Sequence, residues 1–319
     1  MSLIFGVNLS DRIYLAADTR VTHSSPKNGL SWVADRVLKV EVLTDDIVVA
    51  CAGDVILIKY LLMKLRKEPF LKKGIDLTRI NIRVWIAKQV SLFLEEGHSY
   101  AKACFIFGGI NKLKRKVIDG KKLVTLVKEL DSIKRQLPAP PQYLNHVIFQ
   151  GISAKPGLPN PKPELPIADS KLFAIMTDAR NFHLEVKDAE WGEYLVYGPK
   201  EFEREKVPPA IFGRLEFEAG PGGFGAAQSI LTAFIRSIEE TQKLLTVGGP
   251  VTPFVVSEKT GICVMTGEVW RRKLTSHIPE LVSDLKISNG KICFKDNKGI
   301  YKALIPISEY SPKRAGFLI

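Results

Sequence analysis

After Met1 the chain reads Ser2-Leu3-Ile4-Phe5-Gly6-Val7, and after a short polar break it continues Ile13-Tyr14-Leu15-Ala16-Ala17-Asp18-Thr19-Arg20. The apolar runs 3–9 and 13–17 lie on either side of Ser10-Asp11, a pattern that predicts a strand, a turn and a second strand. Such a hairpin carries Asp18, at the end of the second strand, back toward Ser2. We therefore expect a hydroxyl and a carboxylate close together at one end of this hairpin.

Ser2 is a candidate nucleophile if the initiator Met1 is removed. Its own α-amine would then lie beside its own hydroxyl. An α-amine has a pKa of about 8, so at neutral pH part of it is unprotonated and can act as a base. Nucleophile and base would share one residue, as in the N-terminal variants of the activated nucleophile. The alternative is that Ser2 is an ordinary residue near the chain start.

Three later segments extend this pattern. Ala34-Asp35-Arg36-Val37-Leu38-Lys39-Val40 predicts a short strand that mixes apolar and basic residues. The run 47–53 predicts a strand of small and apolar residues that ends in Gly53. Val247-Gly248-Gly249-Pro250 precedes an apolar run at 251–256, which predicts a tight turn and then a further strand.

In their order and spacing these segments resemble the β-type subunits of the proteasome and the bacterial HslV peptidase, members of the N-terminal nucleophile (Ntn) hydrolases. In this resemblance Ser2 stands where the family has its catalytic threonine, with Gly6 in register. Asp18 and Arg20 match the Asp-x-Arg step of the family. Arg36 stands at the position of the family lysine.

The resemblance implies a fold, an activity and a set of roles. The fold is α+β, a four-layer αββα sandwich of two mainly antiparallel sheets between helical layers. The activity is hydrolysis of peptide or amide bonds in a peptide or protein substrate, with no cofactor and no metal. Ser2 would attack the carbonyl above a charge pair of Asp18 and Arg36 that eases its deprotonation. The backbone N–H of Gly53 would stabilise the oxyanion.

Three positions depart from the family pattern. The family has a Ser in a Gly-Ser-Gly turn and an Asp-x-x-Ser before its Gly-Gly step, and here these positions are Pro221, Leu244 and Val247. None of these side chains can donate or accept a hydrogen bond. A second hypothesis is therefore a catalytically inactive proteasome-like subunit with a structural or assembly role. If Met1 is retained, Ser2 has an amide in place of its amine and loses its base.

Composition sets the class of protein. The chain has 319 residues, 45% of them hydrophobic and 25% charged, which suits a globular protein with a sizeable core. No apolar run approaches about 18 residues and no signal-peptide pattern is present, so we expect no membrane span and a cytoplasmic location. The five histidines show no metal-ligand spacing. The four cysteines are expected to be buried free thiols rather than disulfides: Cys51, Cys104, Cys263 and Cys293.

The net charge of +12 is concentrated in the segment 111–135, which holds nine Lys or Arg against three acidic residues. One interpretation is a patch for an acidic partner or a nucleic acid, and the other is a solvated basic surface. No aromatic residue interrupts the run, which argues against a platform for stacking bases. We expect an exposed insertion around 111–142, ended by Pro138-Ala139-Pro140-Pro141.

The remaining pattern predicts the order of elements. Amphipathic helices are expected at 55–67 and 80–95, and a further helix at 226–245 after the Gly-rich turn 220–225. Strands are expected at 103–110, 146–152, 172–176, 182–186, 251–256, 261–265, 286–294 and 300–305. We assign 1–269 to one proteasome-like domain and 270–319 to a C-terminal extension with a short helix and a β-hairpin. Because the family assembles through helices and edge strands, self-association into a ring or another homo-oligomer is expected.

Overall fold

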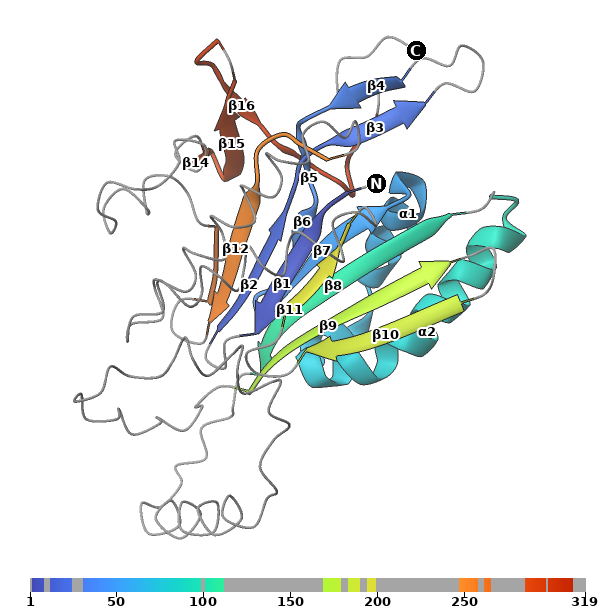
Figure 1. Ribbon diagram of the computed structural model, residues 1–319. Coiled ribbons are helices and arrows are strands. Elements are labelled where there is room, and N and C mark those ends of the chain that lie inside the picture. The colour runs from blue at the N-terminus through green and yellow to red at the C-terminus, as the bar shows by residue number, and fades with distance from the viewer. Residues whose placement is uncertain are drawn as a thin grey trace, which may run out of the picture.

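The computed structural model describes residues 2–8, 12–24, 31–98, 101–111, 169–178, 183–189, 194–198, 247–257, 261–264, 285–296 and 298–311. These residues form an α+β fold whose centre is two five-stranded antiparallel sheets, with helices against one of them (Figure 1). The coarse fold class expected from the sequence is therefore confirmed.

The first sheet is built around the N-terminal hairpin. Its strands lie in the order β11 (Tyr194–Tyr197), β1 (Ile4–Asn8), β2 (Arg12–Ala17), β12 (Thr252–Ser257) and β13 (Gly261–Val264). Ala17 lies opposite Ile4 on one side and opposite Thr252 on the other. The start of β1, the end of β2 and the start of β12 therefore lie together at one end of the sheet. The predicted hairpin is confirmed, since the Asp18 amide donates to the Leu3 carbonyl at 3.1 Å.

The second sheet contains the strand of small residues. Its order is β10 (His183–Ala189), β9 (Asp169–Asp178), β8 (Lys102–Asn111), β7 (Ile47–Gly53) and β6 (Val40–Thr44). Apolar side chains of the two sheets meet in a shared core, which includes Ile4, Ile13 and Leu15 from the first sheet and Val48, Ala50 and Ile106 from the second. Burial of this apolar area between the sheets is the main force that holds them face to face.

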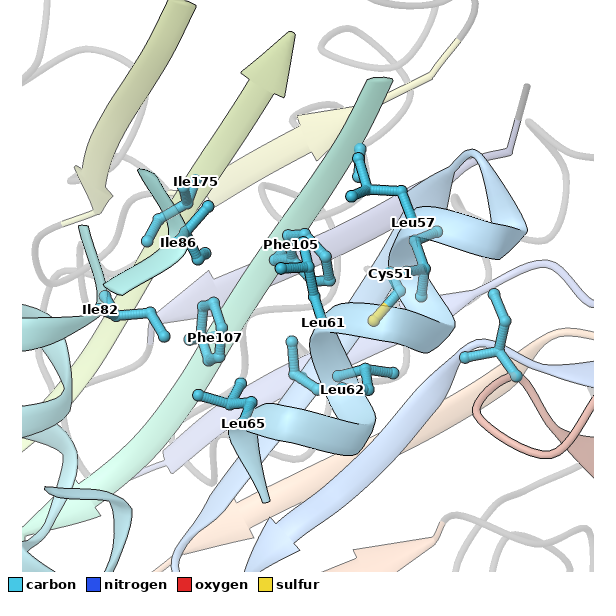
Figure 2. Packing of buried hydrophobic residues seen from close by; sticks show 14 of the residues in the cluster. Cys51, Leu57, Leu61, Leu62, Leu65, Ile82, Ile86, Phe105, Phe107 and Ile175 are labelled. Atoms are coloured by element: carbon cyan, nitrogen blue, oxygen red, sulfur yellow. The ribbon is translucent and has the colours of Figure 1, made fainter. Parts of the chain in front are cut away.

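Helices cover the other face of the second sheet. They are α1 (Val55–Leu65), the short 3₁₀ helix η1 (Pro69–Lys73) and α2 (Ile75–Glu95). Figure 2 shows Leu57, Leu61 and Leu65 of α1 directed toward side chains of the sheet, with Phe105 and Phe107 of β8 among them. Asp54 caps α1 by accepting from the amides of Ile56 and Leu57, each at 2.9 Å. The described residues thus form three layers: helices, second sheet, first sheet.

The helix α2 begins five residues earlier than the sequence pattern predicted. The prediction began this helix at Ile80, which is 67% exposed and lies outside the buried stripe. The buried stripe of α2 begins instead at Ile75 and Thr78, and the Thr78 hydroxyl donates to the Gly74 carbonyl in the first turn. Because its hydroxyl is hydrogen-bonded to the helix backbone, Thr78 can face the core although it is polar. It therefore interrupts the apolar pattern from which the start of the helix was predicted.

Smaller sheets complete the described part of the chain. The hairpin of β3 (Val21–Ser24) and β4 (Ser31–Ala34) follows the first strands, and β14 (Leu285–Ser288), β15 (Lys291–Lys295) and β16 (Tyr301–Ala303) form a three-stranded sheet. The strand β5 (Val37–Leu38) pairs in parallel with β17 (Ile305–Pro306). The expected C-terminal hairpin is therefore present as a three-stranded sheet, and residues just after it reach the core.

Several expectations lie outside the described residues: the strand at 146–152, the turn at 220–225, the helix at 226–245 and nearly all of the basic insertion. The helix at 226–245 was to supply the fourth layer. The boundary at residue 269 stays a prediction. Among the described helices, none is long and apolar enough to cross a membrane. All four cysteines are free thiols; Cys51, Cys104 and Cys293 are buried, whereas Cys263 is exposed on the edge strand β13.

Candidate active site

Asp18 is the centre of the candidate site. It follows β2 directly, its side chain is fully buried, and its carboxylate accepts hydrogen bonds from three backbone amides. These donors are Leu3 at 2.9 Å, Arg20 at 3.2 Å and Gly248 at 3.2 Å. The carboxylate therefore joins the start of β1, the end of β2 and the turn before β12. Such donors stabilise the ionised form of a buried carboxylate.

A lysine supplies the positive charge that faces Asp18. Lys39 Nζ lies 2.8 Å from Asp18 Oδ1, and the exposed fractions of the two side chains are 1% and 0%. Lys39 Nζ also donates to the carbonyl oxygen of Arg20. The two sheets are thus tied together at this end by a buried ion pair.

The structure places Lys39, rather than the expected Arg36, against Asp18. The carbonyl of Arg36 accepts a hydrogen bond from the Ile305 amide. The guanidinium of Arg36 lies near Tyr310: burial raises the pKa of the Tyr310 hydroxyl, and the positive charge of Arg36 partly opposes this. Along the chain, the hairpin β3–β4 lies between Asp18 and the strand β5. The length of this hairpin does not determine which of the two cations, Arg36 or Lys39, contacts Asp18. In the structure Val37 and Leu38 form β5, and Lys39, directly after it, makes the contact.

Burial sets the protonation behaviour of Lys39. Loss of hydration lowers the pKa of its ammonium, while the adjacent Asp18 carboxylate opposes this by charge attraction and hydrogen bonding. An ammonium held in this way is both a fixed positive charge and a group able to release a proton more readily than a lysine in water.

Ser2 lies next to this ion pair. It is 7% exposed and precedes Leu3, whose amide donates to Asp18 Oδ1. Since Lys39 Nζ binds the same oxygen, the ammonium lies beside the peptide that joins Ser2 to Leu3. The hairpin therefore brings the Ser2–Leu3 peptide to Asp18. The closeness of the Ser2 hydroxyl itself to Asp18 stays a prediction.

Arg20 and Asp35 form a second ion pair that supports the turn before β12. Arg20 Nε and Nη2 bind the two carboxylate oxygens of Asp35 at 2.6 and 2.8 Å, and Arg20 Nη1 donates to the Val247 carbonyl at 3.3 Å. The hydrogen bond to Asp35 raises the pKa of Arg20. The Thr19 amide donates to the Gly248 carbonyl at 3.2 Å. The early and late sequence segments of the resemblance therefore meet in space.

Gly53 closes the strand β7 beside this cluster. The Cys51 amide donates to the Lys39 carbonyl at 2.8 Å, so the end of β7, two residues further on, lies near Lys39. Gly53 has a φ of +118°, and a Cβ there would lie 2.2 Å from the Lys102 carbonyl oxygen. Only glycine fits this position. The role of its N–H as an oxyanion donor stays a prediction.

The departures from the family pattern are only partly described. Pro221 and Leu244 lie outside the described residues. Val247 is fully buried and contributes its backbone carbonyl to Arg20. In the part of the chain that the structure describes, no group of three His, Cys, Asp or Glu side chains is placed to hold a metal ion.

No protein-family model matches this chain. No curated protein matches it either. Among solved structures it is similar to Anbu (ancestral beta-subunit) from Yersinia bercovieri, with 12% sequence identity and a TM-score of 0.43 over 82% of this chain and 86% of that chain. So distant a likeness says nothing about the site.

Proposed function

We propose that this chain is a proteasome-like Ntn hydrolase that cleaves peptide or amide bonds with Ser2 as nucleophile after removal of Met1. The observation that carries the proposal is the buried Lys39–Asp18 pair, whose carboxylate also holds the amide of the residue after Ser2. A buried ion pair with three further backbone donors is an expensive arrangement for stability alone, because both charges lose their hydration.

The reaction needs only groups on this chain and a water molecule. Ser2 Oγ attacks the substrate carbonyl carbon, and its proton passes to the Ser2 amine. The amine gives this proton to the leaving nitrogen as the C–N bond breaks, which leaves an ester on Oγ. Water then attacks the ester, transfers a proton through the same amine and releases the acid. No histidine is required.

Lys39 and Gly53 would stabilise the negative charges that develop during the reaction. The ammonium of Lys39 lies beside the Ser2–Leu3 peptide, where its positive charge favours the alkoxide of Ser2 and disfavours protonation of the Ser2 amine. Gly53 would direct its N–H to the oxyanion, and one such donor contributes about 3–4 kcal/mol to transition-state stabilisation.

A structural subunit without activity is the second candidate. It is favoured by Val247, which is buried where the resemblance places a serine. In that case the Lys39–Asp18 pair would fix only the meeting of β1, β2 and β12. The two candidates differ in whether Ser2 is freed and reacts.

The test begins with the N-terminal mass of protein purified from cells, which shows whether Ser2 is the first residue. Processed protein is then treated with a peptide-derived electrophile that captures a hydroxyl and an amine of one residue. We expect labelling of residue 2 in the wild type and in the Ser2→Thr variant, and none in Ser2→Ala. Loss of labelling in Lys39→Ala but not in Arg36→Ala would support the assignment of the lysine. Processed protein that neither hydrolyses peptides nor becomes labelled favours the structural subunit.

The finer architecture and the partners belong to the same proposal. The fourth layer of the αββα sandwich would come from 226–245, against the outer face of the first sheet. Self-association would use the outer faces of α1 and α2, which expose Ile56, Met63, Ile80 and Val84. An acidic partner at 111–135 and a cytoplasmic location complete the proposal.

A further inference from the structure

The segment Leu304–Tyr310, here called the C-terminal segment, is part of the core rather than an appendage. Leu304 is 4% exposed, Ile307 1% and Tyr310 3%. Ile307 and Tyr310 pack with the cluster between the helices and the second sheet. The Lys59 ammonium also donates to the Tyr310 carbonyl at 3.4 Å.

This segment holds the strand that carries Lys39 into the site. The Ile305 amide donates to the Arg36 carbonyl at 2.8 Å, and the Ile307 amide donates to the Leu38 carbonyl at 2.9 Å. On the other side, the Val37 amide donates to the Thr19 carbonyl at 3.0 Å. The strand β5 is only two residues long, so these few bonds define its position.

Glu41 fastens the C-terminal segment just beyond Lys39. This carboxylate is 3% exposed and accepts from the Ser308 amide at 2.7 Å and the Ser308 hydroxyl at 2.9 Å. It also accepts from the guanidinium of Arg66, the C-cap residue of α1. A buried carboxylate is stable only with such partners, so its bonds to Ser308 strongly favour the docked segment.

We propose that the C-terminal segment is a positioning element of the site: docked on β5 and fastened by Glu41, it holds Lys39 against Asp18. Its catalytic consequence rests on the proposed function, whereas its effect on Lys39 does not. A chain that lacks the docked segment has β5 bound on one side only. The site is therefore complete only after the C-terminal segment has docked on β5.

The test measures the accessibility of Lys39 in the full chain. Folded protein is treated with acetic anhydride, and the rate of acetylation at Lys39 is followed by mass spectrometry. The variants are Ser308→Ala, Glu41→Gln and the double variant Ile307→Ala/Ser308→Ala. Ser288→Ala, on β14, is the matched control. Hydrogen exchange is measured in parallel for peptides that contain Leu3, Val37, α2 and the C-terminal segment.

We expect Lys39 acetylation to rise about tenfold in the double variant, because a weaker lock populates a locally open state. Single variants should show a smaller rise, and Ser288→Ala none. Exchange should accelerate at Val37 and at Leu3, whose amide shares the Asp18 oxygen with Lys39, but not in α2. Far-ultraviolet circular dichroism confirms that each variant is folded. If the double variant fails to fold, Ser308→Ala and Glu41→Gln decide the question.

Two outcomes separate this inference from the proposed function. Acetylation of Lys39 at the wild-type rate, in folded variants whose C-terminal segment exchanges faster, overturns the positioning role even if the wild type hydrolyses peptides. Faster acetylation in the variants supports the positioning role even if the wild type shows no hydrolysis. If the wild type is active, kcat should fall in the variants while KM changes little. The variant with the largest increase in Lys39 acetylation should show the largest fall in kcat.

Discussion

At the scale of single residues, the molecule depends on one carboxylate with several partners. Asp18 has no exposed surface, and its oxygens bind Lys39 and the amides of Leu3, Arg20 and Gly248. Each of these donors loses a hydrogen-bond acceptor if the carboxylate moves. Removal of its charge therefore affects β1, β2 and β12 together.

The substitution Asp18→Asn keeps the shape of the side chain but leaves the Lys39 ammonium buried without a counter-charge. We expect a loss of about 3–5 kcal/mol in the free energy of unfolding, measured by urea denaturation. Asp35→Asn is the control, since the Arg20–Asp35 pair has exposed fractions of 19% and 38% and should cost about 1 kcal/mol. Equal losses in the two variants would contradict the central place of Asp18.

The protonation of Lys39 predicts a dependence of stability on pH. Burial lowers its pKa in the folded state below the ordinary value of 10.5. Between that lowered pKa and 10.5 the unfolded chain binds more protons than the folded chain, so the free energy of unfolding rises with pH. Relative to Lys39→Met, the wild type should therefore gain stability as the pH is raised through this window. Parallel curves from urea denaturation of the two proteins would argue against a lowered pKa.

At the scale of elements, the turn before β12 is as constrained as the strands it joins. Gly249 has a φ of +73°, and a Cβ there would lie 2.4 Å from Thr19 Oγ1. The turn packs closely on the residues that follow β2. This close packing explains why the Gly-Gly step lies beside Asp18 although it is far from it in the sequence.

The substitution Gly249→Ala should disturb both the turn and the site. Alanine adds backbone strain of about 1–3 kcal/mol at a positive φ, and its Cβ also forces Thr19 away. Gly261→Ala is a matched control, because Gly261 has a φ of +64° but open space around its missing Cβ. Thermal unfolding should show a clearly larger decrease in Tm for Gly249→Ala, together with loss of any Ser2 labelling. If the decrease in Tm is no larger for Gly249→Ala than for Gly261→Ala, the Thr19 side chain moves aside at little cost and the turn is not tightly constrained.

At the scale of the whole molecule, the helical layer exposes several large apolar side chains on its outer face. Leu77, Ile80 and Val84 follow one another at helical spacing on α2 and are 40%, 67% and 74% exposed. On α1, Ile56 and Met63 are 63% and 55% exposed. Exposed apolar residues gathered in this way are typical of contact surfaces between proteins. The side of the helices that faces away from the second sheet is therefore the surface on which self-association is proposed.

The substitution Val84→Glu tests this surface. It places a charge at a position that is already exposed, so the stability of the single chain should change by no more than about 0.5 kcal/mol. The mass measured by light scattering at micromolar concentration should fall from that of an oligomer toward that of one chain. Arg83→Glu, at an exposed neighbour on α2, should leave the oligomer in place. A wild type that is a stable monomer would remove the basis for the proposed assembly.

The sequence by itself determined the local order of the fold. Alternation and turn residues at 3–17 predicted the β1–β2 hairpin, and small residues before Gly53 predicted β7. Both depend on interactions between near neighbours, which a pattern of apolar and turn residues records directly. The pairing of Asp18 with the chain start followed from the hairpin, because antiparallel register brings its two ends together.

Only the tertiary structure decided which cation reaches Asp18, where α2 begins and where the residues after β16 pack. Arg36 and Lys39 are both basic and three residues apart. The strand β5 between them is bound by the Thr19 carbonyl on one side and by the amides of Ile305 and Ile307, far away in the sequence, on the other. Contacts so distant in sequence leave no periodic signal near either partner. The physical reason is that a buried charge is placed by the sum of its neighbours in space, which no short stretch of sequence contains.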